Sequence, residues 1–313
     1  MIGKVIVVLT IVILVSVVVY DELPLRDLSL GSNVNYGVSV HNMTSLSAGY
    51  VYELGASWIR IDYSQNSPIF AQAVQNAETY GFNVLAILDH WSVPEDFTYQ
   101  QWNLTVRSAV VSYPYITAWE VWNEPDLPTS YYGMVNGSAL QYFTLLKYTY
   151  NDIKSLAPND IVIGLGGYTI PTNETQIAWL LQLKSYGAFN YMNAISLHLS
   201  EPYTENQLFS TTENDTIVTN FYLLAQSFIN SVKTVTSLPI WITEAGAGFD
   251  QSYYINTMYP MFIKEGITHI FWYDLINDNS GLTPNYGLLS QNNIVLTVKP
   301  SFYALQNFIR TNK

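Results

Sequence analysis

YITAWEVWNEP (residues 115–125) and PIWITEAG (residues 239–246) are the two stretches that decide how this 313-residue chain folds. Each contains a short, largely apolar run of the kind that forms a buried strand, and each run ends near a glutamate, Glu124 or Glu244. A carboxylate at the end of a buried strand is costly unless it is paired or used, because the strand interior solvates a charge poorly. The two stretches therefore predict a functional site to which both glutamates contribute.

Apolar runs of the same kind recur along the chain and alternate with segments of helical periodicity. We predict eight strands, at residues 34–41, 56–62, 82–89, 115–121, 161–167, 193–199, 239–243 and 268–274. Helix signals lie between them, such as Ser67-Pro68 before a helix that runs to Gly81. Eight strand–helix units in about 280 residues are typical of a single α/β domain, a (β/α)8 TIM barrel, which we place at residues 33–313.

A doubly wound open sheet is the alternative α/β fold. That fold usually carries a glycine-rich phosphate turn after its first strand, and VSVHN (residues 38–42) is not such a turn. The glycine-rich segment at residues 164–167 lacks the GxGxxG spacing and lies inside the fifth predicted strand. We therefore interpret it as a tightly packed barrel strand.

Composition restricts the classes of partner. The formal net charge is −12 and only 12% of residues are charged, so the chain would repel a nucleic-acid backbone and no nucleic-acid partner is expected. The chain has no cysteine, which excludes disulfides, thiolate nucleophiles and cysteine-bound metal sites. Nothing in the sequence calls for a cofactor.

The first twenty residues form a separate segment. Residues 5–20 are almost entirely apolar, follow Lys4, and as a helix would nearly span the roughly 30 Å of a bilayer. No small-x-small cleavage pattern follows, so we favour a retained membrane anchor over a removed signal peptide for residues 1–20, with a linker over residues 21–32. We expect an extracytoplasmic protein, secreted or anchored. Asn-x-Ser/Thr triplets, glycosylation acceptors in an exported chain, begin at Asn42, Asn103, Asn136, Asn173 and Asn214.

Polar residues at the carboxyl ends of the predicted strands form the candidate site, because these ends meet at one mouth of a barrel. Three of the four histidines fall there, whereas the fourth, His269, begins the eighth strand and belongs to the opposite, structural face. The candidates are His41, Arg60, Asp89, His90, Trp91, Asn123, Glu124, His198, Glu244, Trp272 and Asp274.

The sequence around the two glutamates resembles that of a known group of enzymes. Trp122-Asn123-Glu124-Pro125 and Ile242-Thr243-Glu244-Ala245-Gly246 closely resemble the signatures of clan A glycoside hydrolases, the retaining enzymes with a (β/α)8 barrel. Families 39 and 5 of this clan are the most similar, because of three further segments: SLH (residues 196–198), FWY (residues 271–273) and KPSFYAL (residues 299–305). The resemblance covers nearly the whole chain after Ser32.

The resemblance implies a β-glycoside hydrolase that cleaves an oligo- or polysaccharide by double displacement. By that resemblance Glu124 is the general acid/base and Glu244 the nucleophile. Arg60 and neighbouring donors would hold Glu244 ionised, and the charge of Glu244 would keep Glu124 protonated until the glycosyl-enzyme forms. The long connections at residues 200–215 and 275–299 would wall an open groove, which favours endo action on a β-linked glycan.

The resemblance also implies contacts to the sugar. Asn123 resembles the hydrogen-bond partner of the sugar 2-hydroxyl, and Trp272 looks like the aromatic platform under the reacting sugar. His90 would hydrogen-bond sugar hydroxyls. Trp58, Trp119 and Trp241 lie inside strands, and we expect them to pack the barrel rather than contact sugar.

Two further residues resemble neighbours that orient the nucleophile, His198 and Tyr203. The family 5 pattern usually places the tyrosine two residues after the histidine, and Ser200 stands at that position. Tyr273 or Tyr36 could occupy the same space.

Structural roles are the alternative for several of these residues. Arg60 could pair only with Asp62 or Glu53, and His90 and His198 could be satisfied core histidines. A barrel that binds glycans without cutting them is the alternative function.

A metal site is a further alternative. His41, Asp89, His90 and His198 could gather at the barrel mouth, but no tight ligand spacing such as HExxH occurs, so we predict no metal.

Overall fold

The computed structural model describes residues 34–127, 135, 137–200, 211–277, 285–292 and 295–312, with the backbone alone described over residues 211–219. All of these residues lie in one compact unit, residues 31–313. The predicted anchor and linker, residues 1–32, lie outside the described residues. Within the described ranges, no helix is both long enough and apolar enough to cross a bilayer.

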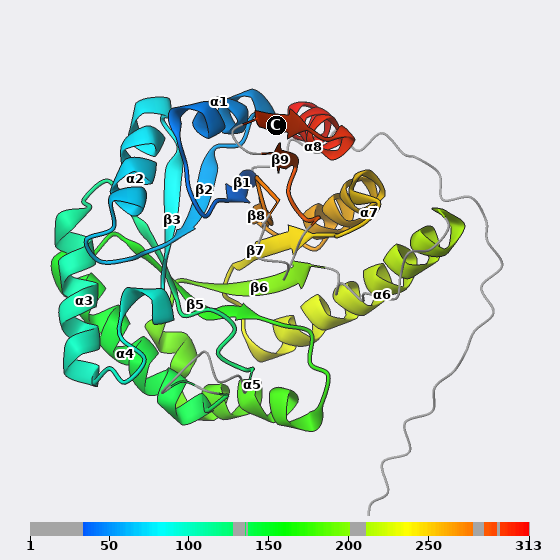
Figure 1. Cartoon of the computed structure of the whole chain (residues 1–313). Helices are drawn as coiled ribbons and strands as arrows, with labels where there is room; N and C mark the ends of the chain where they lie inside the picture. The colour runs from blue at the N-terminus through cyan, green and yellow to red at the C-terminus, as the bar shows by residue number, and fades with distance from the viewer. Residues whose placement is uncertain are drawn as a thin grey trace, which may run out of the picture. The chain divides into compact units, whose positions relative to one another are not determined.

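Eight parallel strands close into a barrel, in which each strand pairs with the next and β1 pairs with β8 (Figure 1). The strands are β1 (Asn35–Ser39), β2 (Trp58–Asp62), β3 (Asn83–Leu88), β4 (Ala118–Val121), β5 (Ile161–Tyr168), β6 (Ala194–Ser200), β7 (Ile240–Gly246) and β8 (His269–Trp272). Every predicted strand is present. The closed ring confirms the predicted (β/α)8 barrel and rules out the open sheet.

A helix follows each strand, and the helices surround the barrel (Figure 1). They are α1 (Ser45–Leu54), α2 (Pro68–Tyr80), α3 (Tyr99–Ser112), α4 (Ala139–Leu156), α5 (Glu174–Tyr186), α6 (Thr211–Val235), α7 (Gln251–Lys264) and α8 (Pro300–Thr311), with the short 3-10 helices η1 (His90–Ser92) and η3 (Ala188–Tyr191). The predicted helix signals are confirmed at α2. The Ser67 hydroxyl accepts from the backbone N–H of Phe70, Pro68 is the first helical residue, and Gly81 ends the helix in the left-handed conformation.

One element was not predicted. The connection after β8 was expected to be a long loop over residues 275–299, but part of it forms an antiparallel hairpin of β9 (Leu289–Asn292) and β10 (Val295–Val298). The hairpin stands outside the barrel sheet. Its strands are four residues long, too short for a clear alternation of apolar and polar residues in the sequence.

A layer of apolar side chains fills the barrel near the amino ends of its strands. It consists of Trp58, Leu85, Ala118, Ile163, Ala194, Trp241 and Phe271. The ring of His269 stacks on Trp241 with centroids 3.5 Å apart, and burial lowers the pKa of His269 to about 4. Trp58 and Trp241 therefore pack the barrel, as predicted, and His269 is neutral and structural. The polar strand ends lie at the other mouth.

Candidate active site

Arg60, on β2, is the buried centre of the polar mouth. Its Nε donates to Glu120 Oε2 at 2.6 Å, Nη1 to Glu244 Oε1 at 2.7 Å, and Nη2 to Asn123 Oδ1 at 3.2 Å. Burial acts to lower the pKa of Arg60, but Glu120 and Glu244 raise it above its ordinary value. Arg60 is therefore a permanent cation with carboxylate partners on β4 and β7, and its role is not limited to Asp62 or Glu53.

Glu120 is a site residue that the sequence analysis missed. It lies within β4, is completely buried, and accepts from Thr243 Oγ1 on β7 at 2.9 Å as well as from Arg60. The only sequence signal was a single acidic residue inside an otherwise apolar strand, between Trp119 and Val121. A buried carboxylate is tolerated here because both of its oxygens accept hydrogen bonds and a cation lies against it.

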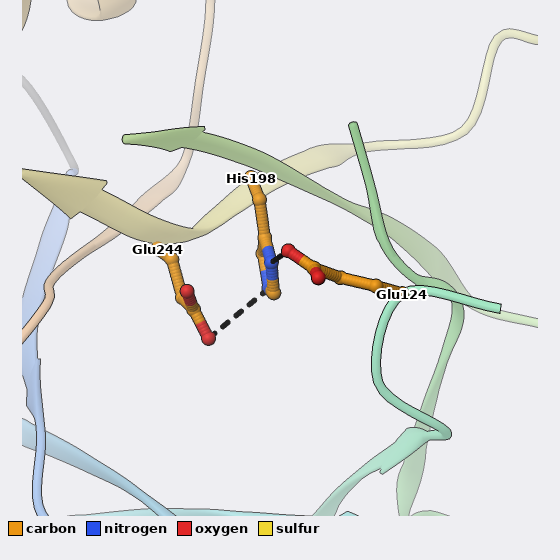
Figure 2. A group of neighbouring side chains, drawn as sticks. All are labelled: Glu124, His198 and Glu244. Atoms are coloured by element: carbon orange, nitrogen blue, oxygen red, sulfur yellow. Dashed lines mark hydrogen bonds and ion pairs between the residues drawn. The ribbon is translucent and has the colours of Figure 1, made fainter. Parts of the chain in front are cut away.

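His198 lies between the two glutamates (Figure 2). Its Nδ1 is 2.9 Å from Glu124 Oε1 and its Nε2 is 3.5 Å from Glu244 Oε1. One carboxylate oxygen of each glutamate and one ring nitrogen of His198 lie within 4.8 Å of one another. His198 on β6 and Glu244 on β7 are also register partners across the sheet.

The protonation of His198 decides which of these contacts are hydrogen bonds. Arg60 Nη2 is 3.3 Å from Nε2, so a neutral His198 with its proton on Nδ1 donates to Glu124 and accepts from Arg60. Burial lowers the pKa of His198, but Glu244 and Glu124 outweigh burial and raise it above its ordinary value. The protonated ring would present Nε2–H to Glu244.

The two glutamates have different surroundings. The Glu244 side chain is 13% exposed and is paired with Arg60, whereas the Glu124 side chain is 24% exposed and has His198 as its described partner. Burial raises the pKa of Glu244, and His198 and Arg60 oppose that rise. The arginine predicted to hold Glu244 ionised is in contact with it, although it does not fully offset the cost of burial.

Backbone geometry after β4 aims Glu124 at the mouth. Trp122 and Glu124 have positive φ angles of 71° and 45°, a backbone conformation that residues other than glycine rarely adopt. The N–H of Glu124 donates to the carbonyl of Gly166 on β5. A Cβ at Gly166 would lie 2.7 Å from the Trp122 carbonyl, and one at Gly167 would lie 2.0 Å from His198 Nε2. The glycine-rich segment is thus a packed barrel strand, as interpreted, and its glycines leave room for the site.

His90 and His41 lie at the same mouth. His90 opens η1 directly after β3, and its Nδ1 is 3.5 Å from Asp89 Oδ2. Burial lowers the pKa of His90, with Asp62 opposing. His41, after β1, has Nε2 3.3 Å from Asp274 Oδ2. Both histidines are partly exposed and can offer hydrogen bonds to a molecule in the mouth.

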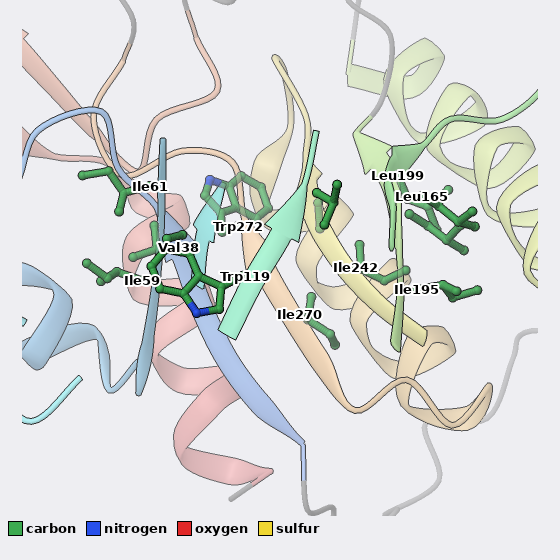
Figure 3. Close-up of a cluster of buried hydrophobic side chains, with 14 of the residues drawn as sticks. Val38, Ile59, Ile61, Trp119, Leu165, Ile195, Leu199, Ile242, Ile270 and Trp272 are labelled. Carbon is green, nitrogen blue, oxygen red and sulfur yellow. The ribbon is translucent and has the colours of Figure 1, made fainter. Parts of the chain in front are cut away.

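Two predicted site residues, Trp272 and Tyr203, are not among the side chains described at the mouth. Trp272 is fully buried in a cluster of apolar side chains (Figure 3). Its indole N–H donates to the carbonyl of Tyr286, and its ring packs edge-on against Tyr254 of α7. The prediction that Trp272 is a sugar platform is wrong, because a fully buried ring offers no face to a sugar. Tyr203 lies outside the described residues.

One group of side chains in the described part of the chain could hold a metal ion, and it consists of Glu124, His198 and Glu244. This differs from the alternative set of His41, Asp89, His90 and His198. The Arg60 guanidinium already lies 2.7 Å from Glu244, and its positive charge would repel a cation bound there. The electrostatics therefore favour a neutral substrate over a metal at this cluster.

Asp126 is a second residue that the sequence analysis missed. It is buried two residues after Glu124, where its Oδ2 accepts from Gln176 Nε2 at 2.8 Å and from Thr169 Oγ1 at 3.0 Å. Its Oδ1 is buried and has no hydrogen-bond partner among the described residues. Burial raises the pKa of Asp126 to about 6, against the lowering effect of Gln176 and Thr169.

Asp126 therefore predicts a pH-dependent stability. The native chain holds this proton up to about pH 6, whereas the unfolded chain loses it near the ordinary value of 3.8, so the stability from this group falls as pH rises through that window. Asp126→Asn, which mimics the protonated form, should raise the free energy of unfolding at pH 7 by up to about 3 kcal/mol and change it little at pH 4. Urea unfolding at both pH values measures this. The exposed Asp96→Asn is the control, and equal effects of Asp126→Asn at both pH values would contradict the assignment.

Glu120 provides a test of the buried ion pairs. Glu120→Gln keeps the side-chain shape but leaves Arg60 with one carboxylate fewer, which should cost about 3–5 kcal/mol of stability. Thermal or urea unfolding measures this loss. Asp152→Asn, which breaks a partly exposed pair with Arg107, should cost at most about 1 kcal/mol. Similar losses in the two variants would show that Arg60 does not depend on Glu120.

Comparison with known proteins supports the fold assignment. No known family pattern and no curated protein sequence matches the chain. Among solved structures, the GH39 enzyme from Xanthomonas axonopodis pv. citri is similar at 15% identity and a TM-score of 0.59, over 88% of this chain and 66% of that enzyme. The hyperthermostable endo-1,4-beta-D-mannanase of Thermotoga petrophila RKU-1 is similar at 13% identity and a TM-score of 0.60, over 88% of this chain and 99% of the mannanase.

A third similar structure is the monomeric beta-xylosidase from Caulobacter crescentus CB15, at 14% identity and a TM-score of 0.61, over 88% of this chain and 67% of the xylosidase. The chain thus spans about two thirds of the length of two of these enzymes. At such identities the likeness concerns the fold. The chain has the eight-stranded parallel barrel fold of the clan A glycoside hydrolases, the group that its two glutamate segments resemble.

Proposed function

We propose that the chain is a retaining β-glycoside hydrolase that cleaves an oligo- or polysaccharide by double displacement. The observation that carries the proposal is the spacing of the two glutamates, which bring one carboxylate oxygen each to within 4.8 Å of the other. Retaining enzymes hold their two carboxyl groups about 5–5.5 Å apart, whereas inverting enzymes leave about 6.5–9.5 Å for a water molecule. The short spacing favours direct attack by a carboxylate.

The surroundings of the glutamates favour Glu244 as the nucleophile. The nucleophile must be an anion, and Glu244 has the Arg60 guanidinium 2.7 Å from one of its oxygens. Glu124 is the more exposed of the two and can reach the oxygen of a leaving group. In the first step Glu244 forms a bond to the anomeric carbon while Glu124 gives its proton to the departing oxygen. The products are a glycosyl-enzyme and a free sugar hydroxyl.

The second step reverses these roles. Glu124, now a carboxylate, takes a proton from water as the water oxygen attacks the anomeric carbon and releases Glu244. His198 contacts both carboxylates and can donate to Glu124 in the carboxylate form that this step needs. Asn123, held by Arg60 through its Oδ1, keeps its amide N–H groups to donate to the sugar 2-hydroxyl.

Substrate size and location are part of the proposal. Polar side chains at or just after the carboxyl ends of β1, β2, β3 and β8 could contact more than one sugar unit, which suits a β-linked glycan chain cut internally. Export, with anchoring through residues 1–20, is inferred from the apolar sequence there.

Two alternatives can be separated from this proposal. A glycan-binding barrel without activity would bind oligosaccharides equally well as wild type and as Glu124→Gln, with no turnover in either. A metal-dependent hydrolase would lose activity in excess chelator, whereas the proposed enzyme keeps it.

Azide rescue tests the two roles in one experiment. Glu124→Ala should lose about 10²–10⁴-fold in turnover on aryl β-glycosides, and azide should restore it by attacking the glycosyl-enzyme to give a β-glycosyl azide. Glu244→Ala should lose at least as much, and azide should attack from the vacated face to give an α-glycosyl azide. Product analysis by NMR distinguishes the anomers.

The exposed Glu78→Ala on α2 is the matched control and should keep wild-type turnover. The same azide anomer from both variants, or rescue of neither on an active wild type, would overturn the assignment of roles.

A further inference from the structure

Trp91 differs from every other tryptophan in the chain. All eight tryptophans lie in the described ranges, and seven of them are at most 7% exposed. The Trp91 side chain is 65% exposed. Leaving so large an aromatic surface in water is unfavourable, so its position calls for an explanation.

The turn that carries Trp91 is held in place. Asp89, which is buried, accepts from the backbone N–H of Trp91 at 2.9 Å, and Ser92 donates from its hydroxyl to the carbonyl of Tyr63 at 2.9 Å. The N–H of Asp89 donates back to the Ser92 hydroxyl, which completes a capping box around η1. The exposed ring therefore stands on an anchored turn rather than on a loose one.

Trp91 also lies at the catalytic end of the barrel. It directly follows β3, whereas every other exposed large apolar side chain in the described part of the chain lies on the helices α1 to α6, on α8 or on β10. The helix positions belong to the outer wall, and the β10 position, Val295, lies on the hairpin in the connection after β8. Among these residues, Trp91 is the only aromatic one in a connection that leaves the carboxyl end of a barrel strand.

Polar groups beside Trp91 match the edge of a sugar ring. The His90 ring lies 4.8 Å from the Trp91 ring at an interplanar angle of 39°. Asp62, at the end of the neighbouring strand β2, is partly exposed and influences His90 electrostatically. A pyranose has an apolar C–H face and a rim of hydroxyls, so it can stack on an indole while donating to a carboxylate.

We propose that Trp91 is a stacking platform for one sugar unit of a β-linked glycan, next to the unit that is cleaved. This rests on the proposed glycosidase function and deepens it by adding a second sugar site. The contacts described for Trp91 involve its own turn and not Glu124, Glu244 or Arg60, so the sugar on Trp91 would be a different unit from the reacting one. The platform that the sequence assigned to Trp272 is thus moved to β3 and to a neighbouring subsite.

Tryptophan fluorescence reads this site directly, because Trp91 is the tryptophan that a quencher in solution reaches. In full-length Glu244→Gln, which binds without turnover, acrylamide quenching should be relieved by at least one of cellohexaose, mannohexaose and xylohexaose. Trp91→Ala should remove the quenchable component itself. Calorimetry on the same background should show the preferred hexasaccharide binding about tenfold more weakly with Trp91→Ala and less than threefold more weakly with Trp91→Phe.

The control is Tyr52→Ala on α1, an aromatic residue as exposed as Trp91 but on the outer wall, which should leave affinity unchanged. Unchanged affinity in Trp91→Ala, or a bound hexasaccharide that does not protect Trp91, overturns the platform while leaving hydrolysis by the wild type untouched. Protection of Trp91 in a chain whose wild type cleaves none of the three supports the platform and overturns the hydrolase. Absence of binding by all three overturns both.

Discussion

One buried guanidinium, that of Arg60, constrains the whole catalytic end of the barrel. Its planar group presents donors at fixed angles, and they reach Glu120, Glu244 and Asn123 at 2.6–3.2 Å. These partners come from β4, from the loop after it and from β7, so a single side chain sets distances between segments far apart in the sequence. Glu120 is completely buried and Glu244 largely so, and neither carboxylate would be tolerated there without this cation.

The rest of the barrel keeps that cation in place. An apolar layer fills the amino end, which leaves the carboxyl end to hold polar groups. His198 on β6 contacts both glutamates, and the glycines of β5 leave room for its ring. Only 12% of residues are charged, so the stability of the rest of the molecule depends mainly on apolar packing, and the buried charges at this mouth are an exception.

The barrel and its two glutamates could be predicted from sequence because their signals are local. Apolar runs, helix caps such as Ser67 and Gly81, and the glutamates after β4 and within β7 can each be recognised within a few residues. The residues missed or misplaced depend on three-dimensional relations. Glu120 lies inside an apolar strand, and its role depends on its ion pair with Arg60, which is 60 residues earlier in the chain.

Trp272 was misplaced for a similar reason. Adjacent residues of a strand face opposite sides of the sheet, and a strand apolar on both faces gives no sign of which residue points inward. Phe271 fills the barrel interior, and Trp272 packs against Tyr254 of α7. The exposure of Trp91 and the burial of Asp126 likewise depend on how the loops pack, which no short sequence pattern records.

The most direct test of the account is the stereochemistry of cleavage. If Glu124 and Glu244 are close enough for attack by the carboxylate, the first sugar released from a β-glycoside carries the β configuration before it equilibrates in water. Proton NMR of the anomeric signal during the first minutes of hydrolysis records that configuration. The account predicts β product first, and α product first would contradict the double displacement assigned to the two glutamates.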